Sequence, residues 1–343
     1  KSATGDQLEN GRKDDGTIIT TRITRLFGIQ YPIVQGGLQL LGRAPLAAAV
    51  SRAGGLGLLT AGCFDSVEEF EEELALLRRW TDGKPFGVNI SIGIRNNMEV
   101  FVDSVCRQQV PIVFTSGRNP EKFVDRLKSH GIIVVHVVPA VRYALTAQRL
   151  GVDAVVMVGF EAGGHPGMDD VGLMALLPRA VDALDIPVIA AGGITDARGI
   201  VAALALGAEG VQMGTRFMMT QECKLHEKVK RQLLSAKETD TLMISRSIRK
   251  AHRVYHNEPA EKVLALEKEG RPVEDLLPII GREASRATIL EGDLSRGVVS
   301  LGQGIGSIDD IPTVEALFHR WANELKTVFQ RLDAMRHGQS QML

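Results

Sequence analysis

Eight short apolar runs, each followed by a helical pattern, limit the possible folds of this chain more than any other feature. They lie at residues 32–35, 56–60, 86–90, 111–115, 132–138, 154–158, 187–191 and 210–213. Most are continuously apolar, as parallel strands buried on both faces are. Strands of this kind that alternate with helices are typical of βαβ units. Because a TIM barrel has eight parallel strands, the sequence predicts an α/β fold, a (β/α)8 TIM barrel of roughly 250 residues.

Local signals agree with the helices between these strands. Ser66 and Glu69 have the spacing of a capping box. Asn119 followed by Pro120 predicts a second helix start, with the proline at the first helical position. A doubly wound sheet is the alternative for βα repeats, but it usually carries its glycine-rich phosphate loop at the first βα turn. Here the glycine-rich loops come late, which favours the barrel.

The chain divides into three predicted regions. Residues 1–19 are polar and charge-mixed and are expected to form an N-terminal tail. Residues 20–223 and 290–336 are expected to form the barrel, and the charged, amphipathic residues 224–289 a helical lid inserted after the eighth strand. A closing helix is predicted at 316–336 from apolar residues at helical spacing. These residues are Ala316, Leu317, Trp321, Leu325, Val328, Phe329 and Leu332.

Composition excludes several classes of partner. The 343 residues are 44% hydrophobic and carry a formal net charge of −1, so a nucleic acid or membrane partner is not expected. No apolar run approaches the roughly 20 residues of a membrane-spanning helix. The three cysteines are widely spaced, and the eight histidines show no ligand spacing, so neither disulfides nor a metal site is predicted. We expect a cytoplasmic protein with a small-molecule substrate; a homodimer is compatible with the Met and Leu residues of the inserted region.

Glycine and polar residues follow the predicted strands, where a barrel places its active site. Gly-Gly pairs follow the first strand at 36–37 and the seventh at 192–193, Asn89 lies at the end of the third strand, and Gly214-Thr215 follows the eighth. Bare backbone on two adjacent late loops can approach a phosphate closely and offer N–H groups to it. The late loops therefore predict a phosphate-bearing cofactor, although each Gly-Gly pair taken alone is equally compatible with a structural turn.

His165 is the candidate catalytic residue. It lies between Gly-Gly and Pro-Gly after the sixth strand, where no helix or strand face is available for packing, and imidazole titrates near neutral pH. His136, within an apolar strand, is expected to be a hydrogen-bonded core residue. Glu161 is expected to cap a loop or support the site from behind, and Cys223 to pack at a helix start.

Several stretches together resemble the nitronate monooxygenases (2-nitropropane dioxygenases), which are FMN-dependent barrel enzymes. The resemblance covers roughly residues 22–310. It rests on Tyr31-Pro-Ile-Val-Gln-Gly-Gly37, Ala53-Gly-Gly-Leu56, Gly87-Val-Asn89, Gly159-Phe-Glu-Ala-Gly-Gly-His165, Ala190-Ala-Gly-Gly193, Gln212-Met-Gly-Thr-Arg-Phe217 and the late Gly302-Gln303-Gly304. Flavin-dependent enoyl-acyl-carrier-protein reductases and NAD(P)H:quinone reductases share most of these stretches, so the resemblance is specific for the superfamily.

The resemblance implies an FMN site. Near the flavin ring it implies Gly37, Leu38, Gln39 and Asn89. Around the ring or the ribityl phosphate it implies Gly163, Gly192, Gly193, Gln212, Met213, Gly214 and Thr215. The matching histidine of the family acts on the substrate, which implies a catalytic His165. Val137 stands where the quinone-reductase branch has a lysine, and Val158 where relatives have Gln or Glu, so those two contacts are not transferable.

Three functions follow from this resemblance. The first is oxidation of an alkyl nitronate with FMN and dioxygen to a carbonyl compound and nitrite, with His165 taking a proton or pairing with the nitronate. The second is an NAD(P)H-dependent FMN reductase acting on an enoyl thioester or a quinone. The third is a flavin-binding barrel without turnover.

Overall fold

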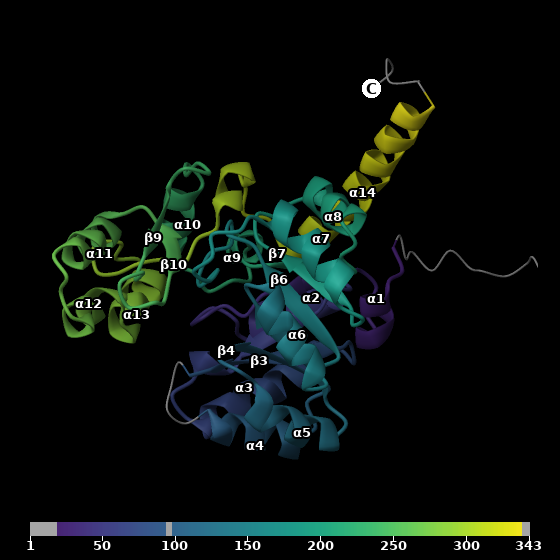
Figure 1. Ribbon diagram of the computed structural model, residues 1–343, viewed down its shortest axis with the longest axis horizontal. Coiled ribbons are helices and arrows are strands. Elements are labelled where there is room, and N and C mark those ends of the chain that lie inside the picture. The colour runs from purple at the N-terminus through teal and green to yellow at the C-terminus, as the bar shows by residue number, and fades with distance from the viewer. Residues whose placement is uncertain (1–18, 94–97, 338–343) are drawn as a thin grey trace, which may run out of the picture.

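A closed ring of eight parallel strands forms the centre of the computed structural model, which describes residues 19–93 and 98–337 (Figure 1). The strands are β1 (Ile33–Gln35), β2 (Gly57–Thr60), β3 (Phe86–Ile92), β4 (Ile112–Gly117), β5 (Ile133–Val138), β6 (Ala154–Val158), β7 (Val188–Ala191) and β8 (Gly210–Met213). Each pairs with its neighbour in chain order, β8 pairs with β1, and a bridge between Val34 and Leu56 joins β1 to β2. The predicted TIM barrel is confirmed.

Helices on the outside connect successive strands. They are α2 (Ala44–Arg52), α3 (Val67–Trp80), α4 (Glu99–Arg107), α5 (Glu121–Ser129), α6 (Val141–Arg149), α7 (Leu173–Ala183), α8 (Ala197–Ala205) and the short α9 (Thr215–Met218). The Ser66 hydroxyl accepts the Glu69 N–H as predicted, but the Glu69 carboxylate accepts from Asp65 instead, so only half of the capping box forms. Helix α5 begins one residue after Pro120, later than predicted.

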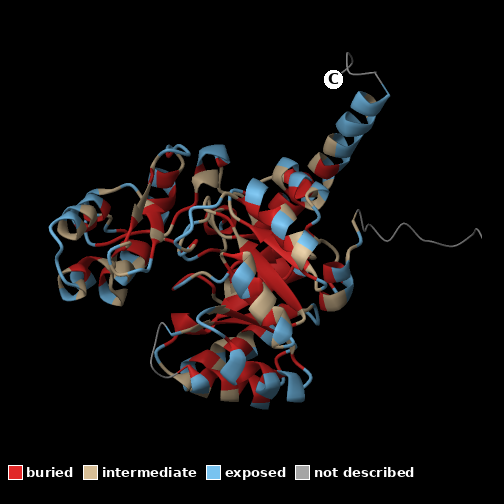
Figure 2. Ribbon diagram, in the orientation of Figure 1, coloured by how far each residue is buried: buried red, intermediate tan, exposed pale blue. Residues whose placement is uncertain are grey.

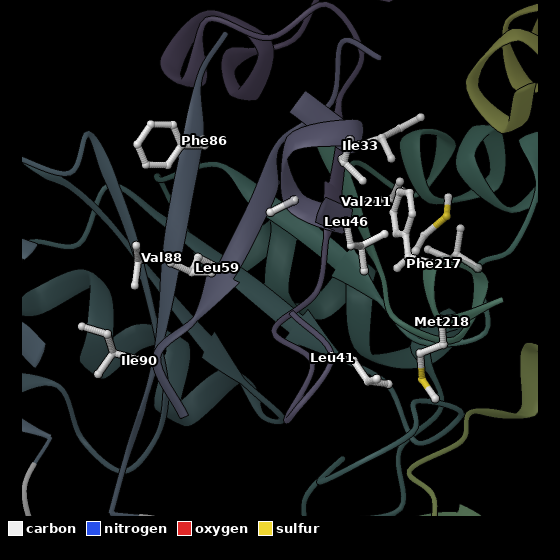
Figure 3. Packing of buried hydrophobic residues seen from close by; sticks show 14 of the residues in the cluster. Ile33, Leu41, Leu46, Leu59, Phe86, Val88, Ile90, Val211, Phe217 and Met218 are labelled. Carbon is white, nitrogen blue, oxygen red and sulfur yellow. The ribbon is translucent and has the colours of Figure 1, made fainter. Parts of the chain in front are cut away.

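Two apolar layers stabilise the barrel. The inner layer fills the ring and is closed at its N-terminal end by α1 (Arg22–Phe27), whose Phe27 ring lies 5.9 Å from that of Phe114. Val137 and Val158 pack at the edge of this inner layer. The outer layer lies between strands and helices, where Figure 3 shows Val88, Leu59 and Phe217 among its members. Figure 2 shows the strands buried and the outer faces of the helices exposed.

The segment 224–289, called the inserted segment below, contains the predicted helices and also a two-stranded sheet. Its elements are α10 (Glu227–Leu233), β9 (Thr241–Ile244), β10 (His252–Tyr255), α11 (Glu258–Lys268) and α12 (Val273–Ile280), followed by α13 (Arg282–Glu291). Strands β9 and β10 are antiparallel and four residues each, too short to be recognised among amphipathic helices. The segment has a small apolar core of its own, which includes Ile244, Val254 and Leu276, and it projects beside the barrel (Figure 1).

The chain returns to the barrel through residues 298–313 and ends in α14 (Val314–Arg336). Two short 3-10 turns, Ala61–Cys63 and Gln303–Ser307, lie in the loops. Trp321 and Leu325 of α14 are buried as predicted, whereas Phe329 and Leu332 are 40% and 44% exposed. Including these two in the packed face was wrong, because the end of α14 projects beyond the barrel (Figure 1).

Three further expectations concern the N-terminal tail, the cysteines and membrane-spanning helices. The predicted tail at 1–19 lies outside the described residues apart from its last residue. All three cysteines are buried and unpaired. Within the described ranges, no helix is long and apolar enough to cross a membrane.

Truncation of a phenylalanine to alanine should cost more stability in the barrel interior than at the exposed end of α14. Phe114→Ala removes a fully buried ring from the barrel interior and should lower the free energy of unfolding by about 3–5 kcal/mol. Phe329→Ala, at an exposed position, should change it by less than about 0.5 kcal/mol. Urea unfolding followed by circular dichroism checks both, and equal losses in the two variants would contradict this description of the core.

Candidate functional site

The loop after β1 brings bare backbone against an amide side chain. A Cβ placed on Gly37 would lie 2.4 Å from the Asn89 side chain, so only glycine allows this approach. The Leu38 N–H donates to the Thr60 hydroxyl at 3.1 Å, and the Gln39 side-chain amide donates to the Gly62 carbonyl at 2.9 Å. These bonds hold a strained turn, since Leu40 has a φ of 66°. The predicted group from Gly37 to Gln39 therefore does meet Asn89.

Polar side chains line the C-terminal end of the barrel interior. Asn89 and Ser91 lie two positions apart on β3 and therefore share its inner face. The Ser91 hydroxyl lies 3.1 Å from that of Ser116 on β4. Across the ring, Gln212 on β8 is 8% exposed, and its Nε2 has no hydrogen-bond partner among the residues that the structure describes. A buried donor without an acceptor is costly unless a ligand supplies one. This end of the barrel is therefore built to receive a polar ligand.

The two late glycine loops present free backbone donors. Gly192 and Gly193 have φ values of 119° and 69°, which turn the chain sharply after β7. In the described part of the chain, the N–H groups of Gly193, Gly214 and Thr215 donate to no protein acceptor. The Thr215 hydroxyl accepts the N–H of Gly302 at 3.0 Å. These donors form a cradle suited to an anion.

Met213 differs from its neighbours in the predicted site. Its side chain is 1% exposed and belongs to the outer apolar layer, because alternate residues of a strand face opposite sides. Its carbonyl accepts the Gly36 N–H at 2.8 Å. A cofactor contact through the Met213 side chain is therefore excluded.

The loop after β6 is fixed at its start by Glu161. Both carboxylate oxygens lie 3.0 Å from the Leu173 N–H at the start of α7, and the Glu161 carbonyl accepts from Gln303 at 2.9 Å. The predicted loop-capping role of Glu161 is confirmed. A Cβ on Gly163 would lie 2.6 Å from the Gly302 nitrogen, so the returning 302–304 segment packs directly on this loop.

His165 lies beyond this loop start, against the inserted segment. Gly164 and Arg253 of β10 form an antiparallel bridge with N–H···O bonds of 3.1 and 2.7 Å. The His165 ring stacks on that of His252, with centroids 4.5 Å apart and planes at 10°. Desolvation lowers the pKa of His165, and the charge of Lys250 lowers it further. The residue stays exposed to solvent, so it is an accessible imidazole that is neutral at pH 7.

The inserted segment contacts loops on two sides of the barrel end. At β6 it contacts Gly164, as above. At β2 the Arg282 guanidinium donates to the Gly62 and Cys63 carbonyls at 2.8 and 3.2 Å and pairs with Asp65 at 3.0 Å. Since Gly62 also accepts from Gln39, the segment is linked to the predicted site through one shared carbonyl.

His136 lies apart from this site. It is 4% exposed, and its Nδ1 lies 2.8 Å from the Thr115 hydroxyl, on the strand faces that point toward the helices. Burial lowers the pKa of His136 to about 4. The prediction of a hydrogen-bonded core histidine is confirmed.

Sequence reasoning missed three residues of the site. Ser91 follows Asn89 by two positions, so the alternation of strand faces could have placed it in the barrel. Ser116 lies in β4, which runs two residues past its predicted end. His252 follows no sequence signal, because its contact with His165 spans 87 positions and depends on the unpredicted β9–β10 pair.

The chain is similar to several known proteins. A family model described as "Nitronate monooxygenase" matches residues 20–111 and 93–324. The structure of FabK from Thermotoga maritima is similar with a TM-score of 0.88 and 37% identity, covering 92% of this chain and 99% of that one. A (3aS,4S,5R,7aS)-5-hydroxy-7a-methyl-1-oxo-octahydro-1H-indene-4-carboxyl-CoA dehydrogenase of Rhodococcus jostii is 31% identical over 92% of this chain and 98% of its own length. A probable nitronate monooxygenase of Staphylococcus aureus is 34% identical over 65% of this chain and 74% of its own.

The capping role of Glu161 predicts a graded response to substitution. Glu161→Ala removes both acceptors from the start of α7 and should lower the free energy of unfolding by about 0.5–2 kcal/mol. Glu161→Gln keeps one carbonyl acceptor and should lose less. Urea unfolding curves of the two variants test this, and a glutamine variant as unstable as the alanine variant would argue against a capping role.

Proposed function

Because this chain belongs to the nitronate monooxygenase family of flavin oxidoreductases, we propose that it is an FMN-dependent reductase that uses NAD(P)H to reduce an α,β-unsaturated acyl thioester. One observation carries the choice: FabK, an enoyl-ACP reductase, matches 92% of this chain at 37% identity. The Rhodococcus relative, which matches over a similar share, is a carboxyl-CoA dehydrogenase. Both names refer to thioester substrates.

The residues at the barrel end fit a flavin. The Nε2 of Gln212, without a partner among the described residues, can donate to a ring heteroatom, and Gly37 has no side chain that would fill the space beside Asn89. On this proposal the ring contacts Gly37, Leu38, Gln39, Asn89, Gly163 and Gln212. The phosphate would be held beside Gly192 by the N–H groups of Gly193, Gly214 and Thr215, which donate to no acceptor in the described part of the chain and suit an anion.

When bound, FMN supplies hydride transfer, and the protein supplies orientation and electrostatics. A neutral His165 donates one N–H to the thioester carbonyl oxygen, which stabilises negative charge as it develops there. Val137 and Val158 give the barrel end an apolar floor. The inserted segment, linked to the loops after β2 and β6, would border the bound substrate.

A second candidate is oxidation of an alkyl nitronate. The family model bears that description, and the Staphylococcus relative, a probable nitronate monooxygenase, is 34% identical over 65% of this chain. In that reaction the neutral His165 would accept the proton of a nitroalkane carbon acid. The candidate is second because this relative matches a smaller share of the chain than FabK does.

An anaerobic absorbance experiment separates the candidates. The FMN-loaded protein is scanned before and after addition of NADH, NADPH or an alkyl nitronate, and crotonyl-CoA is then added to any reduced sample. We expect a nicotinamide to bleach the flavin band and crotonyl-CoA to restore it. Bleaching by the nitronate alone would favour the second candidate, and a band unchanged by every reductant would point to a barrel that binds flavin without turnover.

The phosphate cradle predicts a specific effect of one methyl group. A Cβ on Gly214 would meet only Leu38, at 3.6 Å, and the φ of Gly214 is −106°, so Gly214→Ala should fold with little loss of stability. The same methyl enters the space proposed for the phosphate and should weaken FMN binding by roughly 10–100-fold, the loss of about one hydrogen bond to a charged group. Fluorescence titration with FMN measures this affinity. An unchanged affinity would show that the phosphate does not bind beside Gly214.

A further inference from the structure

His252 is placed beside the candidate catalytic residue by three independent contacts. Its ring is stacked on His165, with a centroid distance of 4.5 Å and a plane angle of 10°. Its Nε2 lies 2.7 Å from the Ser300 hydroxyl. The next residue of β10, Arg253, is bridged to Gly164, the residue before His165. A ring that is fixed by hydrogen bonding on one side can fix the plane of a ring stacked on its face.

The backbone around His252 is braced on both sides. On one side β10 pairs with β9. On the other, Val254 bridges to Ser300, and the Tyr255 N–H donates to the Val299 carbonyl at 2.8 Å. The Ser300 hydroxyl therefore comes from a chain segment that is itself anchored to β10. This rigidity gives His252 little freedom to turn away from His165.

The charges around the pair disfavour a second positive charge. Lys250 acts on His165 electrostatically, and burial together with His165 holds the pKa of His252 well below its ordinary value. The carboxylates nearby have other partners. Glu161 accepts from Leu173, Asp169 pairs with Arg142, and Asp170 pairs with Arg246. The Arg253 guanidinium lies over the Phe160 ring at 4.3 Å.

We propose that His252, held by Ser300, is a positioning residue that fixes the plane of His165 and keeps its imidazole neutral at the active site. This role rests on the proposed function, in which His165 faces the substrate. The stacked ring covers one face of His165 and excludes water from it, so the neutral form is favoured. In the intact pair His165 stays neutral to a pH below the ordinary histidine value of about 6.5. The protonation state of His165 is thus unchanged as the pH falls through that value.

Three variants separate stacking from simple folding. His252→Ala removes the ring and opens one face of His165 to water. His252→Phe keeps a flat ring but cannot bond Ser300, and Ser300→Ala frees the native ring to rotate. His256→Ala is the matched control, because His256 lies in the same segment but is exposed and paired with Glu261 at 2.8 Å.

The first readout is the pKa of His165, measured by NMR titration of the FMN-loaded protein, which needs no turnover. We expect His252→Ala to raise this pKa toward 6.5, Ser300→Ala to raise it less, and His252→Phe and the control to leave it low. An unchanged His165 pKa in both His252→Ala and Ser300→Ala would overturn the proposal. Should His252→Ala not fold, the comparison of Ser300→Ala with the control decides alone.

The second readout is the pH profile of thioester reduction. His252→Ala should lower kcat by roughly 10–100-fold, the usual cost of a misplaced catalytic group, change KM by less than about threefold, and move the limb of the profile that reports His165 to higher pH. A variant with the wild-type profile would overturn the proposal. Absence of thioester turnover in the wild type, with the His165 pKa still dependent on His252, would instead reject the proposed function and keep the pairing of the two rings.

Discussion

Closure of eight parallel strands into a ring is the constraint on which the rest of this structure depends. Every strand in such a ring has two hydrogen-bonded neighbours, and all eight carboxyl ends emerge on one side. Here the closure is completed by pairing of β8 with β1 and by the Val34–Leu56 bridge. Loops far apart in sequence are thereby brought together. Gly37 meets Asn89, and Gly163 meets the returning segment at Gly302.

The inserted segment adds what the barrel alone lacks. Bare backbone and small polar groups at the strand ends can hold a cofactor, but the imidazole of His165 needs a fixed orientation. That orientation comes from outside the barrel, through the bridge of Gly164 to Arg253 and the ring of His252. The same segment reaches across to Gly62 through Arg282. The site is therefore made jointly by barrel loops and a unit with its own small core.

Much of the barrel could be predicted from local sequence, because strands buried on both faces are continuously apolar and recur at regular intervals. The glycine pair after the seventh strand likewise predicted a sharp turn, which Gly192 and Gly193 make. Prediction failed where contacts depend on tertiary packing. The β9–β10 pair is too short to show a period, and His252 reaches His165 only through it. The family resemblance placed Met213 in the site, but alternation along β8 turns its side chain outward.

The central claim is that the strand ends under the inserted segment form a single flavin site facing His165. A crystal structure of the protein with bound FMN tests it most directly. We predict the phosphate within hydrogen-bonding distance of the N–H groups of Gly193, Gly214 and Thr215, and the flavin ring against Gly37 and Asn89. FMN bound elsewhere on the barrel, or with its ring turned away from His165, would contradict the account.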